Sequence, residues 1–180
     1  MNITLKIPAV QALFFLLCFL TLIFPYEAGA EPAQPLIKAP PDVQQAYQQI
    51  SDDFDLYQQF LQADETSRGP VLLNARNPDE AYVFLSRGFG SDLAAAICSS
   101  FTWYDSELEC LFLIPCEGLP TIGLTEKNGV MYSWEAKDML SFQYRFENCY
   151  QPGDAYLYRV TVRLLDGRWK IETLELFEAV

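Results

Sequence analysis

Apolar residues between positions 42 and 61 recur at steps of three and four, which is the spacing of one face of an α-helix. The opposite face is polar and rich in glutamine. Asp42 stands where it can cap the first turn, and Gly69-Pro70 ends the segment. The pattern predicts one long amphipathic helix, whose apolar members are Val43, Ala46, Tyr47, Ile50, Phe54, Tyr57, Phe60 and Leu61.

Two shorter helices are predicted next. Asn77-Pro78-Asp79-Glu80 combines a capping Asn, a Pro in the first turn and a Glu three residues after the cap. This helix runs to about Arg87, and Gly88 is placed to end it. Ser91 is placed to cap a third helix, whose buried stripe is Leu93, Ala94, Ile97, Cys98, Phe101 and Tyr104.

From Glu107 onward the pattern changes to that of β-strands. Residues 108–114 are apolar on both faces, as in a central strand, and residues 130–135 form a short strand. Residues 140–147 and 156–164 alternate between apolar and polar. Asp166-Gly167 predicts a two-residue hairpin. The returning apolar series slips by one residue, so we expect a β-bulge near Glu172-Thr173.

Helices followed by strands define an α+β fold. We expect three N-terminal helices packed on a curved antiparallel sheet of four to five strands, in a single domain over residues 42–180. A curved sheet wrapped on a helix is similar to the cone of nuclear-transport-factor-two-like domains.

The N-terminal segment has the features of an export signal. Its apolar run, Ala9 to Phe24, is 16 residues long, which is shorter than the roughly 18 residues of a spanning helix. Ala28-Gly29-Ala30 supplies the small residues that signal peptidase needs. We expect a signal peptide over residues 1–30, cleavage after Ala30, a proline-rich tether over residues 31–41 and an exported mature chain without a membrane span. An uncleaved anchor is the alternative.

The chain is acidic, with 12 basic residues, 24 acidic residues and no histidine, for a net charge of −12 at pH 7. Such a field repels nucleic acid and anionic lipid, and it steers a basic partner towards the surface. Solubility alone is the other explanation of the charge.

Four cysteines follow the expected cleavage site: Cys98, Cys110, Cys116 and Cys149. An even number in an exported chain indicates two disulfides. Cys110 and Cys116 lie about 20 Å apart in an extended strand, which is too far for a bond. Two pairings remain. Cys98 lies about 9 Å back from the end of the third helix, and Cys110 lies a similar distance along the strand that returns beside it. This favours Cys98–Cys110 together with Cys116–Cys149. A zinc site is the rival interpretation, but the spacings do not fit one and histidine is missing.

The absence of histidine removes Ser-His-Asp and Cys-His catalysis and the usual proton shuttle. We therefore expect a protein that is not an enzyme and has no cofactor. Paired carboxylates remain possible, because glycan hydrolases need only two of them. The candidates are Asp52, Asp53, Asp55, Asp64 and Glu65, although such a cluster on the polar face of a helix is usually just solvated.

Aromatic residues of the predicted strands share one side of the sheet: Phe142, Tyr144, Phe146, Tyr156, Tyr158 and Trp169. In a cone they could wall a pocket for a small apolar ligand. The alternative is that they form the core under the helices. Trp103-Tyr104 and Tyr132 with Trp134 lie near element ends and are candidate partner contacts, because Trp and Tyr are enriched at binding hot spots.

Several stretches resemble the exported DL-endopeptidase inhibitor family of Gram-positive bacteria. The resemblance begins at Ala81-Tyr82-Val83-Phe84-Leu85-Ser86 and continues through Ser91-Asp92-Leu93-Ala94. It ends with Tyr156-Leu157-Tyr158-Arg159-Val160-Thr161-Val162 and Asp166-Gly167-Arg168-Trp169-Lys170-Ile171, which look like the terminal hairpin of the family. In all, it covers about 100 residues, from roughly Asp79 to Glu178.

The resemblance implies a non-catalytic protein that docks over the catalytic groove of cysteine-type cell-wall peptidases and blocks it. We therefore expect a secreted binding protein that inhibits cell-wall DL-endopeptidases, with a basic envelope enzyme as its partner. The alternatives are a cone domain that binds a small apolar ligand and a carboxylate-dependent glycan hydrolase.

Overall fold

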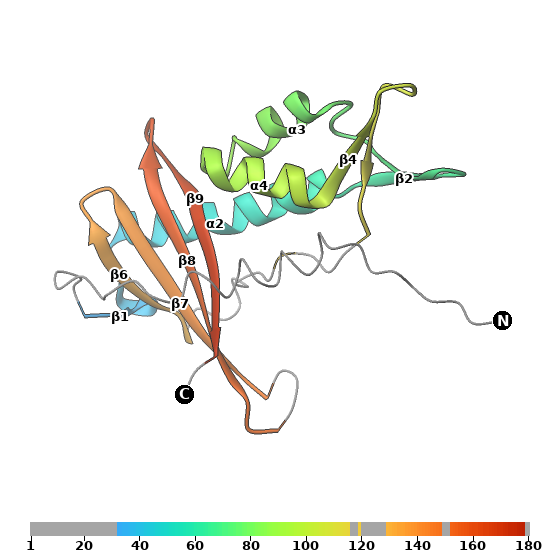
Figure 1. The fold of residues 1–180 in the computed structure, drawn as a ribbon. Coiled ribbons are helices and arrows are strands. Elements are labelled where there is room, and N and C mark those ends of the chain that lie inside the picture. Colours follow the sequence, from blue (N-terminus) through green and yellow to red (C-terminus); the bar gives the residue numbers. More distant parts are fainter. Residues whose placement is uncertain (1–31, 116–118, 120–128, 149–151, 179–180) are drawn as a thin grey trace.

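The computed structural model describes residues 32–115, 119, 129–148 and 152–178. Within them the protein is α+β, with three α-helices and two antiparallel sheets (Figure 1). The helices are α2 (Pro41–Phe60), α3 (Pro78–Leu85) and α4 (Ser91–Phe101), preceded by the short 3₁₀ helix η1 (Leu36–Lys38).

The larger sheet has five strands in the order β1-β6-β7-β8-β9. They are β1 (Gln34–Pro35), β6 (Met131–Ala136), β7 (Met139–Glu147), β8 (Ala155–Leu165) and β9 (Arg168–Glu178). The smaller sheet has four strands in the order β2-β3-β5-β4. They are β2 (Ala63–Thr66), β3 (Gly69–Leu72), β5 (Cys110–Leu113) and β4 (Thr102–Asp105).

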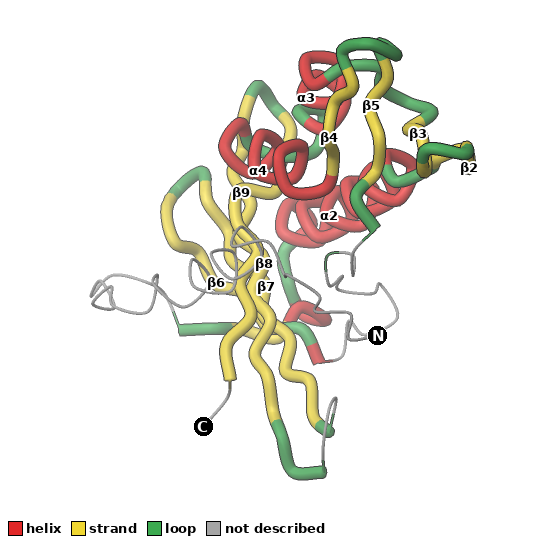
Figure 2. The backbone as a smooth tube through the Cα atoms, turned by 45° about the vertical axis from the view of Figure 1, so that its right-hand side comes forward, coloured by secondary structure: helices red, strands yellow, loops and turns green. Residues whose placement is uncertain are grey.

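Helix α2 lies between the larger sheet and the group formed by α3, α4 and the smaller sheet (Figures 1 and 2). Near its start, the Tyr47 ring packs 5.4 Å from the Phe142 ring of β7. Near its end, the Tyr57 ring packs edge-on at 5.9 Å from Phe101 of α4. The apolar face predicted from the sequence is therefore buried along the helix, and it joins both parts of the molecule through one core.

The expected order of elements and the expected single sheet are wrong. The β2–β3 hairpin separates α2 from α3, and residues 102–104, predicted as the end of the third helix, lie in strand β4 (Thr102–Asp105). The strands of the smaller sheet are only four residues long, too short for their alternation to stand out from a helical pattern. The structure has two sheets and three helices that are not all N-terminal, and it is not clearly the cone that the sequence suggested.

The long terminal hairpin was predicted correctly. Asp166 and Gly167 form its two-residue turn with φ values of 52° and 80°, which is the left-handed region that such a turn requires. Thr161 pairs with Thr173 and Val162 pairs with Ile171, so Glu172 is the extra residue of a β-bulge. The bulge shifts the apolar series of β9 as its sequence indicated.

The proline-rich segment before α2, predicted as a tether, contacts the domain. Gln34 and Pro35 of β1 pair with Tyr132 and Met131 of β6. Leu36 and Ala39 are buried in the core. At least residues 34–39 are therefore packed structure in this protein.

Of the three predicted helix caps, one is confirmed. The Asn77 side chain accepts a hydrogen bond of 2.9 Å from the backbone N–H of Glu80. The N-cap positions of α2 and α4 are Pro40 and Gly90, neither of which caps through a side chain, so Asp42 and Ser91 lie inside their helices.

We expect Asn77→Ala to lower the free energy of unfolding by about 1 kcal/mol, because the first turn of α3 loses a bonded acceptor. Ser91→Ala is the matched control, and its effect should stay within about 0.5 kcal/mol because Ser91 does not cap α4. Urea unfolding followed by tryptophan fluorescence measures both. Equal losses in the two variants would contradict the assignment of the caps.

Candidate functional site

The five carboxylates considered for catalysis do not form one cluster. Asp52 and Asp55 are exposed on α2, and Asp64 and Glu65 are exposed on β2. Asp53 differs, because its side chain is completely buried. It follows Ile50 by three positions and precedes Tyr57 by four, so it lies within the apolar stripe of α2, and this phase was the sequence signal for its burial.

Asp53 is held by Arg168, the first residue of β9. The Arg168 Nη2 atom donates a hydrogen bond of 2.5 Å to Asp53 Oδ1. Asp53 Oδ2 and Arg168 Nε are buried without a hydrogen-bond partner. Burial raises the pKa of the Asp53 carboxyl to about 7, although the Arg168 charge acts in the opposite direction.

The loop between α3 and α4 closes over this carboxyl. A Cβ atom at Gly88 would lie 2.5 Å from Asp53 Oδ1, so only glycine allows this approach. The backbone of the same loop is bonded to β9, with Ile171 N–H donating to the Gly88 carbonyl and Gly90 N–H donating to the Ile171 carbonyl. Asp53 is therefore enclosed by α2, the loop and the start of β9.

The proposed disulfide between Cys98 and Cys110 is not formed. Both residues are free cysteines, Cys98 buried in α4 and Cys110 partly buried at the start of β5. Cys110 pairs with Asp105, at the turn end of the β4–β5 hairpin, whereas Thr102 at the helix end pairs with Leu113. The hairpin thus carries Cys110 away from α4. Cys116 and Cys149 lie outside the described residues.

The aromatic side chains of the larger sheet divide into two groups. The buried group is Tyr132, Phe142, Tyr158 and Trp169, so Tyr132 is not the partner contact that its sequence position suggested. Tyr47 of α2 packs on Phe142. The remaining members are half-buried, and they are Trp134, Tyr144, Phe146, Tyr156 and Phe177. Trp134 and Trp169 pack together with ring centroids 6.0 Å apart. The buried group forms part of the core, which was the alternative to a ligand pocket in the sequence analysis.

Negative charge is concentrated in one part of the chain. Residues 42–114, here called the acidic half, hold twelve acidic and three basic side chains, a net charge of −9. Residues 129–178 hold eight acidic and six basic side chains, a net charge of −2. Arginines of the larger sheet are paired with carboxylates, as in Arg145–Glu147 at 3.2 Å and Arg163–Asp138 at 3.6 Å. Most of the net negative charge of residues 42–178 therefore lies on the three α-helices and the smaller sheet.

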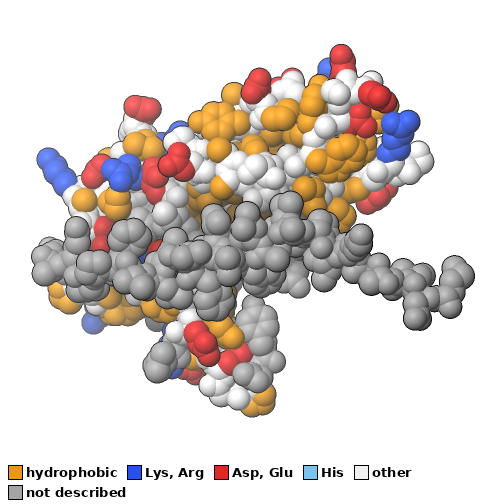
Figure 3. All heavy atoms as spheres, viewed as in Figure 1, with side chains coloured by type: hydrophobic (Ala, Val, Ile, Leu, Met, Phe, Trp, Pro, Cys, Tyr) orange, Lys and Arg blue, Asp and Glu red, His pale blue; other side chains and the backbone are white. Residues whose placement is uncertain are grey.

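The acidic half also exposes large apolar side chains. Of the nine such residues that the described ranges contain, six fall between positions 73 and 108: Leu73, Tyr82, Val83, Trp103, Tyr104 and Leu108. Hydrophobic side chains gather over α3, α4 and β4 in the space-filling view (Figure 3). Trp103 is 45% exposed although its ring stacks on Phe112, with centroids 4.5 Å apart. Because Trp and Tyr are enriched at protein-binding hot spots, Trp103 remains a candidate partner contact.

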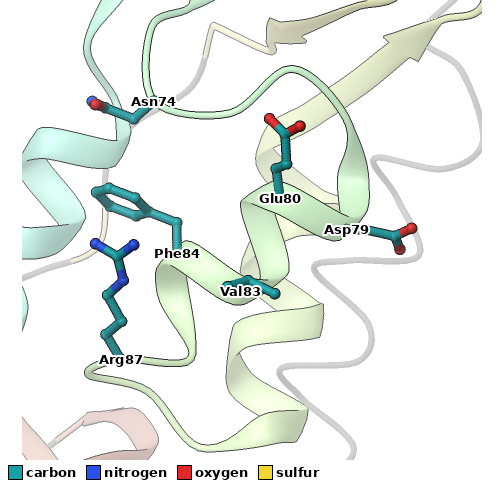
Figure 4. Close-up of a pocket in the computed structure, with 6 residues that line it drawn as sticks. All are labelled: Asn74, Asp79, Glu80, Val83, Phe84 and Arg87. Atoms are coloured by element: carbon teal, nitrogen blue, oxygen red, sulfur yellow. The ribbon is translucent and has the colours of Figure 1, made fainter.

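A shallow groove of about 330 Å³ lies beside α3, lined by Asn74, Asp79, Glu80, Val83, Phe84 and Arg87 (Figure 4). The Arg87 guanidinium lies 5.0 Å from the centre of the Phe84 ring. The groove therefore already contains a cation–π contact within the chain.

The part of the chain that the structure describes contains no group of three Cys, Asp or Glu side chains able to hold a metal ion. No helix among these residues is both long and apolar enough to cross a membrane. No family model matches the chain, and neither the curated proteins nor the solved structures contain a significant match to it.

The buried carboxyl of Asp53 predicts a pH dependence of stability. Its ordinary pKa is 3.8 and its pKa in the folded protein is about 7, so between these values the folded state holds a proton that the unfolded state has lost. Stability should therefore fall as pH rises from 4 to 7, by at most about 1.4 kcal/mol per pH unit from this group. Urea unfolding at pH 5 and pH 7 measures the difference.

Asp53→Asn should remove much of this dependence, because the amide does not ionise. Asp55→Asn is the matched control, since Asp55 is an exposed carboxylate of the same helix and is not among the charges that shift the Asp53 pKa. If the two variants lose stability with pH to the same extent as the native protein, the raised pKa of Asp53 is wrong.

Proposed function

We propose that this chain is an exported, non-catalytic binding protein that recognises a basic protein through its acidic half. The observation that carries the proposal is the coincidence of two features in residues 42–114. This part has a net charge of −9, and it contains six exposed large apolar residues. Charge alone would serve solubility, but solubility does not account for exposed Trp and Tyr.

The two features have different roles in binding. The negative field raises the association rate of a basic partner and disfavours acidic ones. Trp103 and Tyr104 supply large apolar contact areas at little cost in conformational entropy. The Trp103 ring is held in place by its stacking on Phe112, so it is preorganised for contact.

The absence of catalysis is part of the proposal. The sequence contains no histidine, and Asp53, the one carboxyl group among the described residues whose pKa is clearly raised, is enclosed beneath Gly88. A buried carboxyl bonded to an arginine holds elements together, and it offers no access to a substrate.

The partner that we propose is a cysteine-type cell-wall DL-endopeptidase. The resemblance over residues 79–178 and the export signal expected at residues 1–30 motivate this choice. A basic enzyme attached to the acidic polymers of an envelope would also complement the acidic half electrostatically.

The test uses purified residues 31–180 and a basic DL-endopeptidase, with binding measured by calorimetry and inhibition measured by release of wall peptides. We expect inhibition without any wall cleavage by the protein itself, and an affinity that falls as salt is raised. Trp103→Ala should weaken binding by about tenfold or more, as removal of a hot spot does.

Leu176→Ala is the matched control, because Leu176 is exposed to a similar extent, 48% against 45% for Trp103, but lies on β9 of the larger sheet. It should leave the affinity unchanged. Thermal unfolding of both variants checks that each is folded. Absence of binding to the enzyme, or an equal loss in the two variants, would count against the proposal.

A further inference from the structure

Strand β4 lies at the edge of the smaller sheet, and among the described strands it pairs with β5 alone. The register between β4 and β5 fixes which backbone groups of β4 are hydrogen-bonded within the sheet. Ile114 N–H donates to the Phe101 carbonyl, so Phe101–Ile114 is a hydrogen-bonded pair, and the next such pair along the ladder is Trp103–Phe112. The backbone N–H and C=O of Tyr104 therefore point away from β5, towards the edge of the sheet that no described strand covers, here called the free edge.

Two of the other edge strands, β9 and β2, are protected in part. The first half of β9 is covered by the loop between α3 and α4, through the bridge between Phe89 and Ile171 and the bonds of Gly88 and Gly90. Strand β2 has the exposed charges of Asp64 and Glu65. Charge and coverage are the usual means by which proteins keep an edge from pairing with another chain.

Strand β4 lacks these protections and exposes aromatic side chains. Its two central residues are Trp103 and Tyr104, exposed by 45% and 41%, and they project to opposite faces of the sheet. An added strand would thus meet one aromatic ring on each face. No proline or lysine lies in β4 to oppose pairing.

Acidic residues beside this edge would favour an added strand that is basic. Asp105 ends β4, and its Oδ1 atom accepts hydrogen bonds from the N–H groups of Glu107 and Leu108, which fixes the following turn. Glu107 and Glu109 are exposed on that turn. Only Arg68 lies near, with its Nη1 atom 4.0 Å from Asp105 Oδ2, so among the described residues the turn keeps an excess of negative charge.

We propose that the free edge of β4 accepts an extended segment of a basic protein as a fifth strand of the smaller sheet, held by the Tyr104 backbone and oriented by the acidic turn. This deepens the proposed function and rests on it, because it states how the acidic half engages its partner. Main-chain pairing supplies the affinity in such complexes, and side chains at the edge supply the specificity.

The test uses two synthetic six-residue peptides that alternate arginine and valine, one unmodified and one N-methylated at every interior residue. Methylation removes the peptide N–H donors but keeps charge and side chains, so it blocks strand addition specifically. We expect the unmodified peptide to bind at least about tenfold more tightly. It should also protect the Tyr104 amide from hydrogen exchange. A peptide alternating glutamate and valine is the control for charge, and it should not bind.

The outcomes separate the two proposals. If both basic peptides bind equally, or if Tyr104 stays unprotected, strand addition is wrong and the acidic half binds basic segments in another way. If neither peptide binds while the DL-endopeptidase does, strand addition is again wrong and the proposed function stands. If neither the peptides nor the enzyme bind, both proposals fail.

The double variant Glu107→Gln, Glu109→Gln should bind the unmodified peptide more weakly than the native protein does. Its stability should be unchanged, since both side chains are exposed.

Discussion

The apolar face of α2 has to serve two packing partners, and the rest of the structure depends on this requirement. The helix has 20 residues, about 30 Å of length. Its first half lies on the larger sheet, where Tyr47 meets Phe142, and its second half lies beneath α3 and α4, where Tyr57 meets Phe101. One continuous core therefore joins two parts whose outer surfaces differ. Asp53 interrupts that face at a cost in desolvation, and its bond to Arg168 attaches the start of β9 to the helix.

The two outer surfaces differ because charge and exposed aromatic residues are distributed unequally along the chain. The larger sheet has nearly balanced charge, and its arginines are paired with neighbouring carboxylates. The smaller sheet and the helices carry most of the net negative charge and also expose Trp103. This combination of charge and exposed aromatic area is the basis of the proposal that the acidic half binds a partner.

Elements with long, regular patterns or a strong local signal could be predicted from the sequence. The stripe of α2, the cap of α3 at Asn77 and the turn at Asp166-Gly167 each have a local cause, and all were predicted correctly. Of the smaller sheet, β5 lies within the strand predicted at residues 108–114, whereas β2, β3 and β4 were missed because four-residue strands show too few alternations to be told from a helix end. The expected Cys98–Cys110 bond failed for the same reason, since it depended on where the chain turned after α4. The burial of Asp53 could have been inferred from its helical phase, but its partner Arg168 is 115 positions away and only the fold brings them together.

The claim on which the account depends is that the smaller sheet, and not the larger one, is the surface that meets a basic partner. Zero-length carbodiimide crosslinking of the complex with a basic DL-endopeptidase, followed by peptide mapping, tests it directly, because a carboxylate reacts only with a lysine in contact with it. The account predicts crosslinks at Asp105, Glu107 or Glu109 beside β4. Crosslinks confined to Asp138, Glu147 or Glu175 of the larger sheet would contradict it.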